Sequence, residues 1–138
     1  MNHPRLLLAD DCTDNAELLR GLLQPEFDVI AIVEDGHALV TAAERLAPDV
    51  IVADISMPGL DGITAAAVIR RTNPTARIVF VTVHNEPAMV ERGLATGALG
   101  YVLKLAAGDE LAIAVRAALR GERHVSEALR RPPGRIDP

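Results

Sequence analysis

Aromatic residues, cysteine and long apolar runs are scarce in this sequence, and each shortage narrows what the chain can be. Aromatics make up 2% of it and tryptophan is missing, so aliphatic side chains must build the core from the 49% of residues that are hydrophobic. Cys12 is the only cysteine, which excludes a disulfide within the chain. No apolar run approaches the roughly twenty residues that a membrane helix needs. We therefore expect one globular domain with no membrane segment.

Acidic residues outnumber basic ones, and the excess is uneven. The formal net charge is -5, with 16 acidic and 8 basic residues in 1–115 but six arginines and three acidic residues in 116–138. The acidic part would repel a nucleic-acid backbone, so we expect this domain itself to bind no nucleic acid. No leader of the secretory type opens the sequence, which predicts a cytoplasmic protein.

Apolar runs alternate with segments of helical periodicity. The runs are continuously apolar, as expected for strands covered on both faces, and they span 5–9, 28–33, 49–53, 77–82 and 100–103. Helices are expected between and after them, at about 14–23, 36–46, 61–72, 86–96 and 108–120. Five such repeats predict an α/β domain with a parallel sheet and helices on both faces.

Local signals suggest how these helices begin and which faces they bury. Asp14 and Glu17 have capping-box spacing, and Asp61 is more readily explained as a helix cap than as a metal ligand. The apolar faces of the first and fifth helices are expected to contain Leu18, Leu19, Leu22 and Leu23, and Leu111, Ile113, Val115 and Leu119, respectively.

Four of the apolar runs stop at a polar residue of a chemically useful kind. These residues are Asp10 and Asp11, then Asp54, Thr82 and Lys104. The carboxyl ends of parallel strands lie at one edge of the sheet, where ligands bind, so we expect the five side chains to share one cleft. Three carboxylates there would repel one another and any phosphate. A divalent cation such as Mg²⁺ resolves both problems, because it prefers oxygen ligands.

Lys104 strengthens this interpretation. It is the only lysine in a chain with fourteen Lys plus Arg. A compact ammonium on a flexible stem differs from the planar fork of arginine, and it suits the oxygens of a phosphoryl group.

The chain resembles the receiver domain of bacterial two-component response regulators over about residues 4–121. The motifs that carry the resemblance are LLLADD at 6–11, VIVADISMPGLDG at 50–62, VTVH at 81–84 and GYVLK at 100–104. The resemblance implies a flavodoxin-like doubly wound sheet of five parallel strands, in the order 2-1-3-4-5, with five helices. It also implies that Asp54 accepts a phosphoryl group from the phosphohistidine of a sensor histidine kinase.

The family pattern further assigns roles around Asp54. Mg²⁺ would be bound by Asp11, Asp54 and the main-chain carbonyl of Ser56, with Asp10 helping through water. Thr82 and Lys104 would hold the phosphoryl oxygens. Tyr101 would turn inward when Thr82 shifts. Without the resemblance, Tyr101 would be interpreted as a half-buried aromatic residue in a strand. His84 is expected at the rim of the cleft, where it would tune dephosphorylation.

Two residues depart from the family pattern. Receivers usually have proline after the last lysine, joined by a cis bond, but Leu105 follows Lys104 here. A cis bond before a residue other than proline costs about 2.5–4 kcal/mol, so we expect a trans bond and a displaced loop. Val83 replaces a small residue and is expected to narrow access to the phosphoryl group.

Two other classes of function remain open from the residues. A Mg²⁺-dependent phosphatase with an aspartate nucleophile also uses carboxylates at strand ends, but it usually presents them as Asp-x-Asp, whereas Asp10 and Asp11 are adjacent. A nucleotide-binding protein would carry a phosphate-binding loop. Neither G-x-x-x-x-G-K-[ST] nor G-x-G-x-x-G occurs, and the glycines at 93, 97 and 100 have the wrong spacing.

The C-terminal part predicts how the domain is connected. Residues 114–131 resemble the end of a receiver and the linker of NarL/FixJ (LuxR)-type regulators, so we expect a receiver over 1–121 and a flexible linker or tail over 122–138. Output would be transcriptional control through a separate DNA-binding domain, or protein–protein contact by a stand-alone receiver. We expect phosphorylation to favour a homodimer through the fourth helix, fifth strand and fifth helix.

Overall fold

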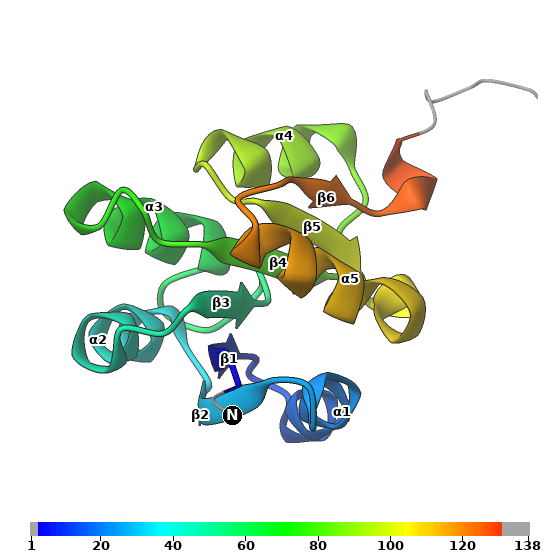
Figure 1. The fold of residues 1–138 in the computed structure, drawn as a ribbon. Coiled ribbons are helices and arrows are strands. Elements are labelled where there is room, and N and C mark those ends of the chain that lie inside the picture. Colours follow the sequence, from blue (N-terminus) through cyan, green and yellow to red (C-terminus); the bar gives the residue numbers. More distant parts are fainter. Residues whose placement is uncertain (1–2, 131–138) are drawn as a thin grey trace, which may run out of the picture.

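Six parallel strands form the sheet at the centre of the computed structural model, which describes residues 3–130 (Figure 1). Their order is β2-β1-β3-β4-β5-β6. The bounds are Arg5–Ala9 for β1, Asp28–Val33 for β2, Val50–Ala53 for β3, Ile78–Thr82 for β4, Gly100–Leu103 for β5 and His124–Val125 for β6. The predicted order of the first five strands is confirmed, and the predicted count of five is wrong by one.

Helices cover both faces of this sheet. Helices α1 and α5 lie on one face and α2, α3 and α4 on the other, as the end-on view in Figure 1 shows. The bounds are Thr13–Leu23 for α1, Gly36–Leu46 for α2, Gly62–Thr72 for α3, Pro87–Ala95 for α4 and Ala107–Leu119 for α5. Short 3-10 helices follow β5 and β6, namely η1 at Lys104–Ala106 and η2 at Glu127–Leu129. Within residues 3–130, no helix combines the length and apolarity needed to span a bilayer.

Each face of the sheet has its own apolar core. The α1/α5 side is filled mainly by leucine, valine and alanine, and the other side also contains Phe80 and Tyr101. Strands β1, β3 and β4 contribute to both sides, because successive side chains point to opposite faces. Their continuous apolar runs are therefore explained by burial on two faces.

The segment after α5 differs from its prediction as a flexible linker. His124–Val125 pairs with β5 as the sixth strand, and Glu127–Leu129 forms η2. A two-residue strand has too few side chains to show an alternating pattern, which is why the sequence did not indicate it. Residues 131–138 of the expected tail lie outside the described residues.

Some helix signals were read correctly and others were not. Asp61 is the N-cap of α3, and its side chain accepts a hydrogen bond from the amide of Thr64, as predicted. The expected capping box at Asp14 is wrong, because α1 begins one residue earlier and Cys12 is its N-cap. Leu18 and Ile113, expected on buried faces, are 64% and 44% exposed. Both residues lie at the side of the apolar stripe of their helix, because the stripe that is buried is narrower than the distribution of apolar residues in the sequence suggests.

Strand pairing brings the predicted polar residues to one edge. Ala9 of β1 pairs with Ala53 of β3, so the residues that follow, Asp10 and Asp54, emerge side by side. Thr82 of β4 likewise pairs with Leu103 of β5, the residue before Lys104. The parallel register therefore brings these residues together at the carboxyl ends of four strands, along one edge of the sheet.

Candidate functional site

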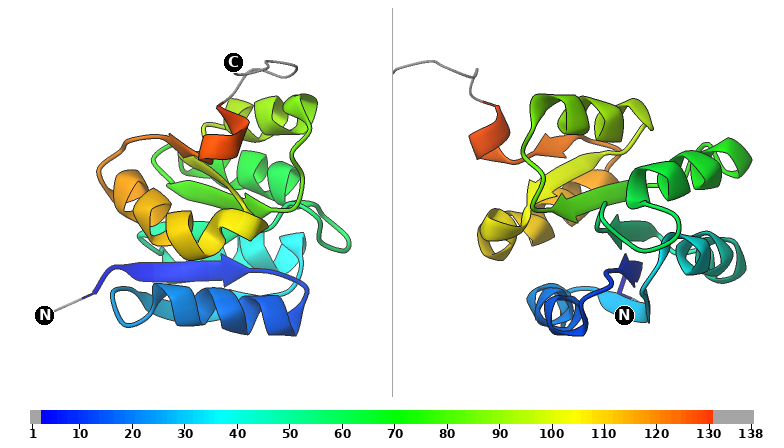
Figure 2. Two further views of the ribbon diagram at one scale, coloured as in Figure 1. Left: turned by 90° about the vertical axis from the view of Figure 1, so that its right-hand side faces the viewer. Right: turned by 180° about the vertical axis from the view of Figure 1, so that it is seen from behind.

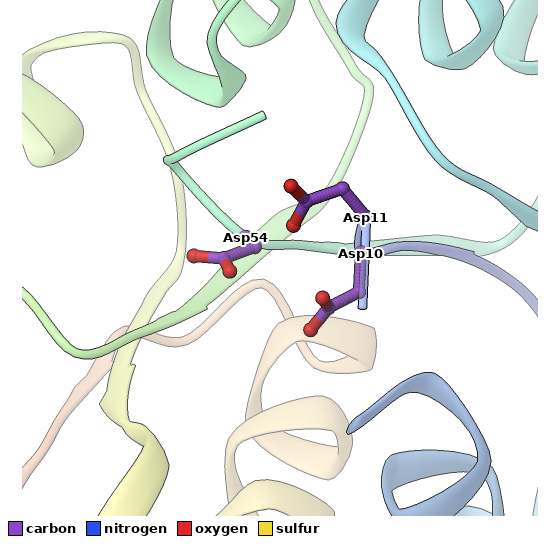
Figure 3. Close-up of side chains that lie close together, drawn as sticks. All are labelled: Asp10, Asp11 and Asp54. Carbon is purple, nitrogen blue, oxygen red and sulfur yellow. The ribbon is translucent and has the colours of Figure 1, made fainter. Parts of the chain in front are cut away.

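Three carboxylates meet at the ends of β1 and β3. Asp10, Asp11 and Asp54 each offer an oxygen that lies within 4.8 Å of the others, and Figure 3 shows the three side chains close together. Asp10 and Asp54 are buried, whereas Asp11 is exposed to the cleft. The predicted cluster is therefore present as a geometric group.

Backbone amides fix the orientation of the two buried carboxylates. The Asp10 Oδ1 atom accepts a hydrogen bond from the Cys12 amide at 2.9 Å, and the Asp54 Oδ1 atom accepts one from the Ile55 amide at 2.7 Å. Among the described residues, the buried Oδ2 atom of Asp10 finds no hydrogen-bond partner. A buried carboxylate oxygen with no donor is a position that a cation would satisfy.

Lys104 supplies the positive charge nearest to this cluster. Its ammonium nitrogen lies 2.7 Å from Asp54 Oδ2 and 3.3 Å from Asp10 Oδ2, the second contact being an ion pair without hydrogen-bond geometry. Burial alone lowers the pKa of Lys104, but the hydrogen bond and charge of Asp54, together with Asp10, outweigh burial and raise it. Lys104 is therefore held as a cation against Asp54.

A cleft of about 570 Å³ opens beside the carboxylates. Asp11, Ser56, Asp61 and His84 are among the residues that line it, so the predicted position of His84 at the rim is confirmed. The Ser56 hydroxyl and His84 Nε2 are 2.6 Å apart, which joins the loop after β3 to the loop after β4. The cleft is therefore bounded by a side-chain hydrogen bond on one side.

Thr82 and Tyr101 are both fully buried behind this cleft. The Thr82 hydroxyl accepts a hydrogen bond from the His84 amide at 3.3 Å, and the Tyr101 hydroxyl donates one to the His84 carbonyl at 2.9 Å. Burial, with smaller contributions from the charges of Glu86 and Asp54, raises the pKa of Tyr101 to about 12. The default expectation of a half-buried tyrosine is wrong, because Tyr101 already points inward.

Two glycines to which the sequence analysis gave no packing role make this geometry feasible. A Cβ on Gly62 would overlap the carbonyl oxygen of Asp54, and one on Gly93 would lie 3.0 Å from the Tyr101 ring. Phe80 closes another side of that ring, with centroids 6.3 Å apart in an edge-to-face arrangement. Gly93 is an isolated glycine inside a helix, and such a residue often has a packing reason that sequence alone hints at.

The two departures from the family pattern both lie at the surface. The Lys104–Leu105 peptide bond is trans, as predicted, and η1 begins at Lys104. Leu105 is fully exposed and Val83 is 68% exposed. Ser56 lies in the loop directly after Asp54 and Ile55, where its main-chain carbonyl remains a predicted metal ligand.

Comparisons with known proteins agree on one family. A model described as the response regulator receiver domain matches residues 6–116. An uncharacterized transcriptional regulatory protein of Bacillus subtilis, YxjL, is 38% identical over 120 residues, which are 86% of this chain and 55% of YxjL. The chain spans about half the length of the curated relatives it matches.

Solved structures give the same result. A two-component response regulator of the LuxR family from Aurantimonas sp. SI85-9A1 has a TM-score of 0.88 and 32% identity, with 93% of each chain covered. The isolated receiver domain of RcsB from Salmonella enterica serovar Typhimurium, solved in the presence of the phosphomimetic BeF3-, has a TM-score of 0.84 and 31% identity. That match covers 93% of this chain and 96% of the RcsB chain.

Proposed function

The chain belongs to the receiver domains of bacterial two-component response regulators, of the NarL/FixJ (LuxR) type, and from this premise we propose that it accepts a phosphoryl group on Asp54. The donor is the phosphohistidine of a sensor histidine kinase. The receiver acts as a signalling switch whose own chemistry is limited to self-phosphorylation and autodephosphorylation. Its output is transcriptional control through a DNA-binding domain, consistent with relatives that are named as transcriptional regulators.

One observation carries this proposal. The Asp54 carboxylate, buried at a strand end, is oriented by the Ile55 amide through Oδ1 and faces the Lys104 ammonium through Oδ2. A nucleophile needs a fixed direction of attack, and the developing charge on phosphorus needs a cation nearby. The Ile55 amide fixes the direction of the Asp54 carboxylate, and the Lys104 ammonium is the nearby cation, 2.7 Å from Asp54 Oδ2.

The acidic cluster fits a magnesium ion. Asp10, Asp11 and Asp54 offer only oxygen donors, and Asp10 Oδ2 is buried without a hydrogen bond. When bound, Mg²⁺ would neutralise the carboxylates and polarise the phosphoryl oxygens. We propose Asp11, Asp54 and the Ser56 carbonyl as its direct ligands, with Asp10 acting through water.

The side chains then divide the chemistry among them. An oxygen of Asp54 attacks phosphorus, the new O–P bond forms as the N–P bond to the kinase histidine breaks, and the imidazole nitrogen leaves with the bonding electron pair. Lys104 and the Thr82 hydroxyl bind the transferred oxygens, and this requires Lys104 to shift from its contact with Asp54. Thr82 moves toward the phosphoryl group, and Tyr101, which is already fully buried behind the cleft, occupies the inward position that goes with this movement.

The remaining partners are also proposed. Phosphorylation favours a homodimer through α4, β5 and α5, and this domain itself binds neither nucleic acid nor membrane. We propose a receiver over 1–121, to whose sheet the following segment adds the short strand β6. The cytoplasmic location stays a prediction.

A phosphatase with an aspartate nucleophile is the alternative that shares these carboxylates and Mg²⁺. The two functions differ in turnover. A phosphatase would release phosphate from a small phosphomonoester continuously, whereas a receiver is labelled once and transiently. Stoichiometric labelling without continuous release supports the receiver.

Labelling of Asp54 tests the proposal. Incubation with a cognate kinase or a small phosphodonor and Mg²⁺ is expected to add one phosphoryl group that hydroxylamine removes, as it does from an acyl phosphate. Asp54→Ala should not be labelled, whereas Asp61→Asn, which alters the α3 cap in the same cleft, should be labelled normally. Equal labelling of Asp54→Ala would overturn the assignment.

A further inference from the structure

The segment after α5 returns to the sheet and binds along the free edge of β5. We call residues 122–130 the strap; it lies beside β5 and close to α4 in two views (Figures 1 and 2). The His124 amide donates to the Leu99 carbonyl at 2.8 Å, and the Ser126 amide donates to the Tyr101 carbonyl at 2.9 Å. The Leu103 amide donates to the Ser126 hydroxyl at 2.9 Å. The strap thus binds the backbone on both sides of Tyr101.

A second anchor comes from α5. His124 Nε2 lies 2.8 Å from the Glu110 carboxylate, and the pKa of this carboxylate is lowered by His124, the Glu127 amide and Ser126. Glu110 is only 16% exposed, and Ser126 is fully buried with its hydroxyl accepting the hydrogen bond from the Leu103 amide. Such a satisfied, buried polar cluster specifies one position for the strap.

The end of the strap lies over the α4 side of β5. Leu129 packs against the same apolar cluster that contains Tyr101. Together with Ala128 it lines a groove of about 630 Å³, whose other residues include Glu86, Val90 and Leu103. The Tyr101 hydroxyl is bonded to the His84 carbonyl, two residues before Glu86, so the ring extends toward the residues that form this groove.

Tyr101 therefore has α4 and Phe80 on two sides and the strap beside its own strand. Gly93 leaves room for the ring where it stands, because a Cβ at this position would lie 3.0 Å from the ring edge. We propose that the strap is a lock that holds Tyr101 in its inward position, with Ser126 and Leu129 as positioning residues. The lock itself depends only on this packing. Its effect on phosphoryl binding rests on the function proposed above.

Intrinsic fluorescence tests the lock directly, because Tyr101 is the only tyrosine and the chain has no tryptophan. In the full chain at neutral pH, acrylamide should quench the wild-type protein weakly. Ser126→Ala and Leu129→Ala should lose most of this shielding and approach the quenching of free tyrosinamide. Arg123→Ala, an exposed change within the strap, should behave as wild type, and Leu129→Met should restore the shielding.

Two further measurements, circular dichroism and the pKa of Tyr101, distinguish release of the strap from unfolding of the domain. Far-UV circular dichroism should be unchanged in the variants, whereas the pKa of Tyr101, measured by phenolate absorbance, should fall from about 12 toward the ordinary 10.0. If Ser126→Ala fails to fold, Leu129→Ala decides, since its side chain is half-buried at the surface. Fast amide exchange in the strap with unchanged quenching of Tyr101 would overturn the lock.

The phosphomimetic shows whether the lock reaches the cleft. By thermodynamic reciprocity, a strap that favours inward Tyr101 must favour any ligand that needs this state. Beryllofluoride with Mg²⁺ should bind Ser126→Ala severalfold more weakly than wild type, and equal affinity would limit the lock to Tyr101. Failure of the wild-type chain to bind beryllofluoride would remove the proposed phosphorylation, while the quenching comparison would still decide the lock.

Discussion

Lys104 lies between two buried carboxylates, and its removal tests how far the cleft depends on charge balance. Lys104→Met leaves Asp54 and Asp10 without their cation, so we expect a loss of up to about 3 kcal/mol in the free energy of unfolding. Added Mg²⁺ should restore part of this loss, because an ion that binds only the folded state stabilises it. Urea unfolding at pH 7 measures both effects. A variant as stable as wild type, with no response to Mg²⁺, would contradict the charge argument.

Val83 and Leu105 are the residues where this chain departs from its family, and both are exposed. Val83→Ala should speed phosphorylation and dephosphorylation, since a smaller side chain beside Thr82 widens access to Asp54. Leu105→Pro should change both rates by altering the turn that begins at Lys104. Stopped-flow phosphorylation with a small phosphodonor measures the rates. An exposed substitution such as Val83→Ala usually changes stability by less than about 0.5 kcal/mol, and an unfolding curve of Leu105→Pro checks that its fold is retained. Unchanged rates in both variants would show that neither position matters.

At single residues, the sequence predicted which residues form the site better than it predicted how deeply each side chain is buried. Asp10, Asp54, Thr82 and Lys104 were placed in one cleft because each ends a strand, and strand ends share an edge. The full burial of Tyr101 was not foreseen. It depends on Gly93, which is close in space because α4 packs on β5, and no local pattern links the two residues.

Among the elements, β6 and its link to α5 carry a dependence on pH. Burial raises the pKa of Glu110, but hydrogen bonds from His124, the Glu127 amide and Ser126 outweigh burial and lower it. A carboxyl group with a lowered folded-state pKa contributes stability that is complete above its ordinary 4.5 and is lost as the pH falls through the folded-state value. The strap should therefore loosen in acid.

Hydrogen exchange of the strap amides measures this dependence. After correction for intrinsic exchange rates, protection of Ser126 and His124 should decrease below pH 4.5 in wild type. Glu110→Gln removes the titrating group, so its protection should be lower at neutral pH and flat over the same range. Glu91→Gln, an exposed change on α4, is the matched control. A wild-type strap whose protection ignores pH would contradict the role of Glu110.

The five repeats of strand and helix could be predicted because buried parallel strands are continuously apolar and the helices are punctuated by glycine and proline. The sixth strand could not. The anchor of this strand is the contact between Glu110 and His124, which lie on different elements fourteen residues apart. Helical spacing detects neighbours three or four residues apart and has no means of finding such a pair.

For the whole molecule, the contacts within one chain change the surface that was predicted to dimerise. Glu110 is engaged by His124, Arg116 pairs with Glu26 at 2.6 Å, and Arg120 pairs with Glu122 at 2.8 Å. Glu110 and Arg116 of α5 and Arg120 at its end therefore already have partners in the same chain. On α4, Glu91 and Arg92 remain exposed beside the half-buried Val90 and Leu94. A dimer through this side would be centred on α4 and the end of the strap.

Sedimentation at matched concentrations tests the predicted dimer. Beryllofluoride with Mg²⁺ should raise the dimer fraction, and added salt should lower it, because charges of both signs lie at the contact. Arg116→Glu should reduce dimerisation if α5 takes part. The substitution also replaces the Arg116–Glu26 ion pair by two negative charges. Because a surface ion pair contributes less than about 1 kcal/mol to stability, the protein should still fold. Arg45→Glu on α2 makes the same charge change on an exposed site elsewhere and should leave dimerisation unaltered. A chain that binds beryllofluoride and stays monomeric at every salt concentration would retain its phosphorylation site and lose the dimer.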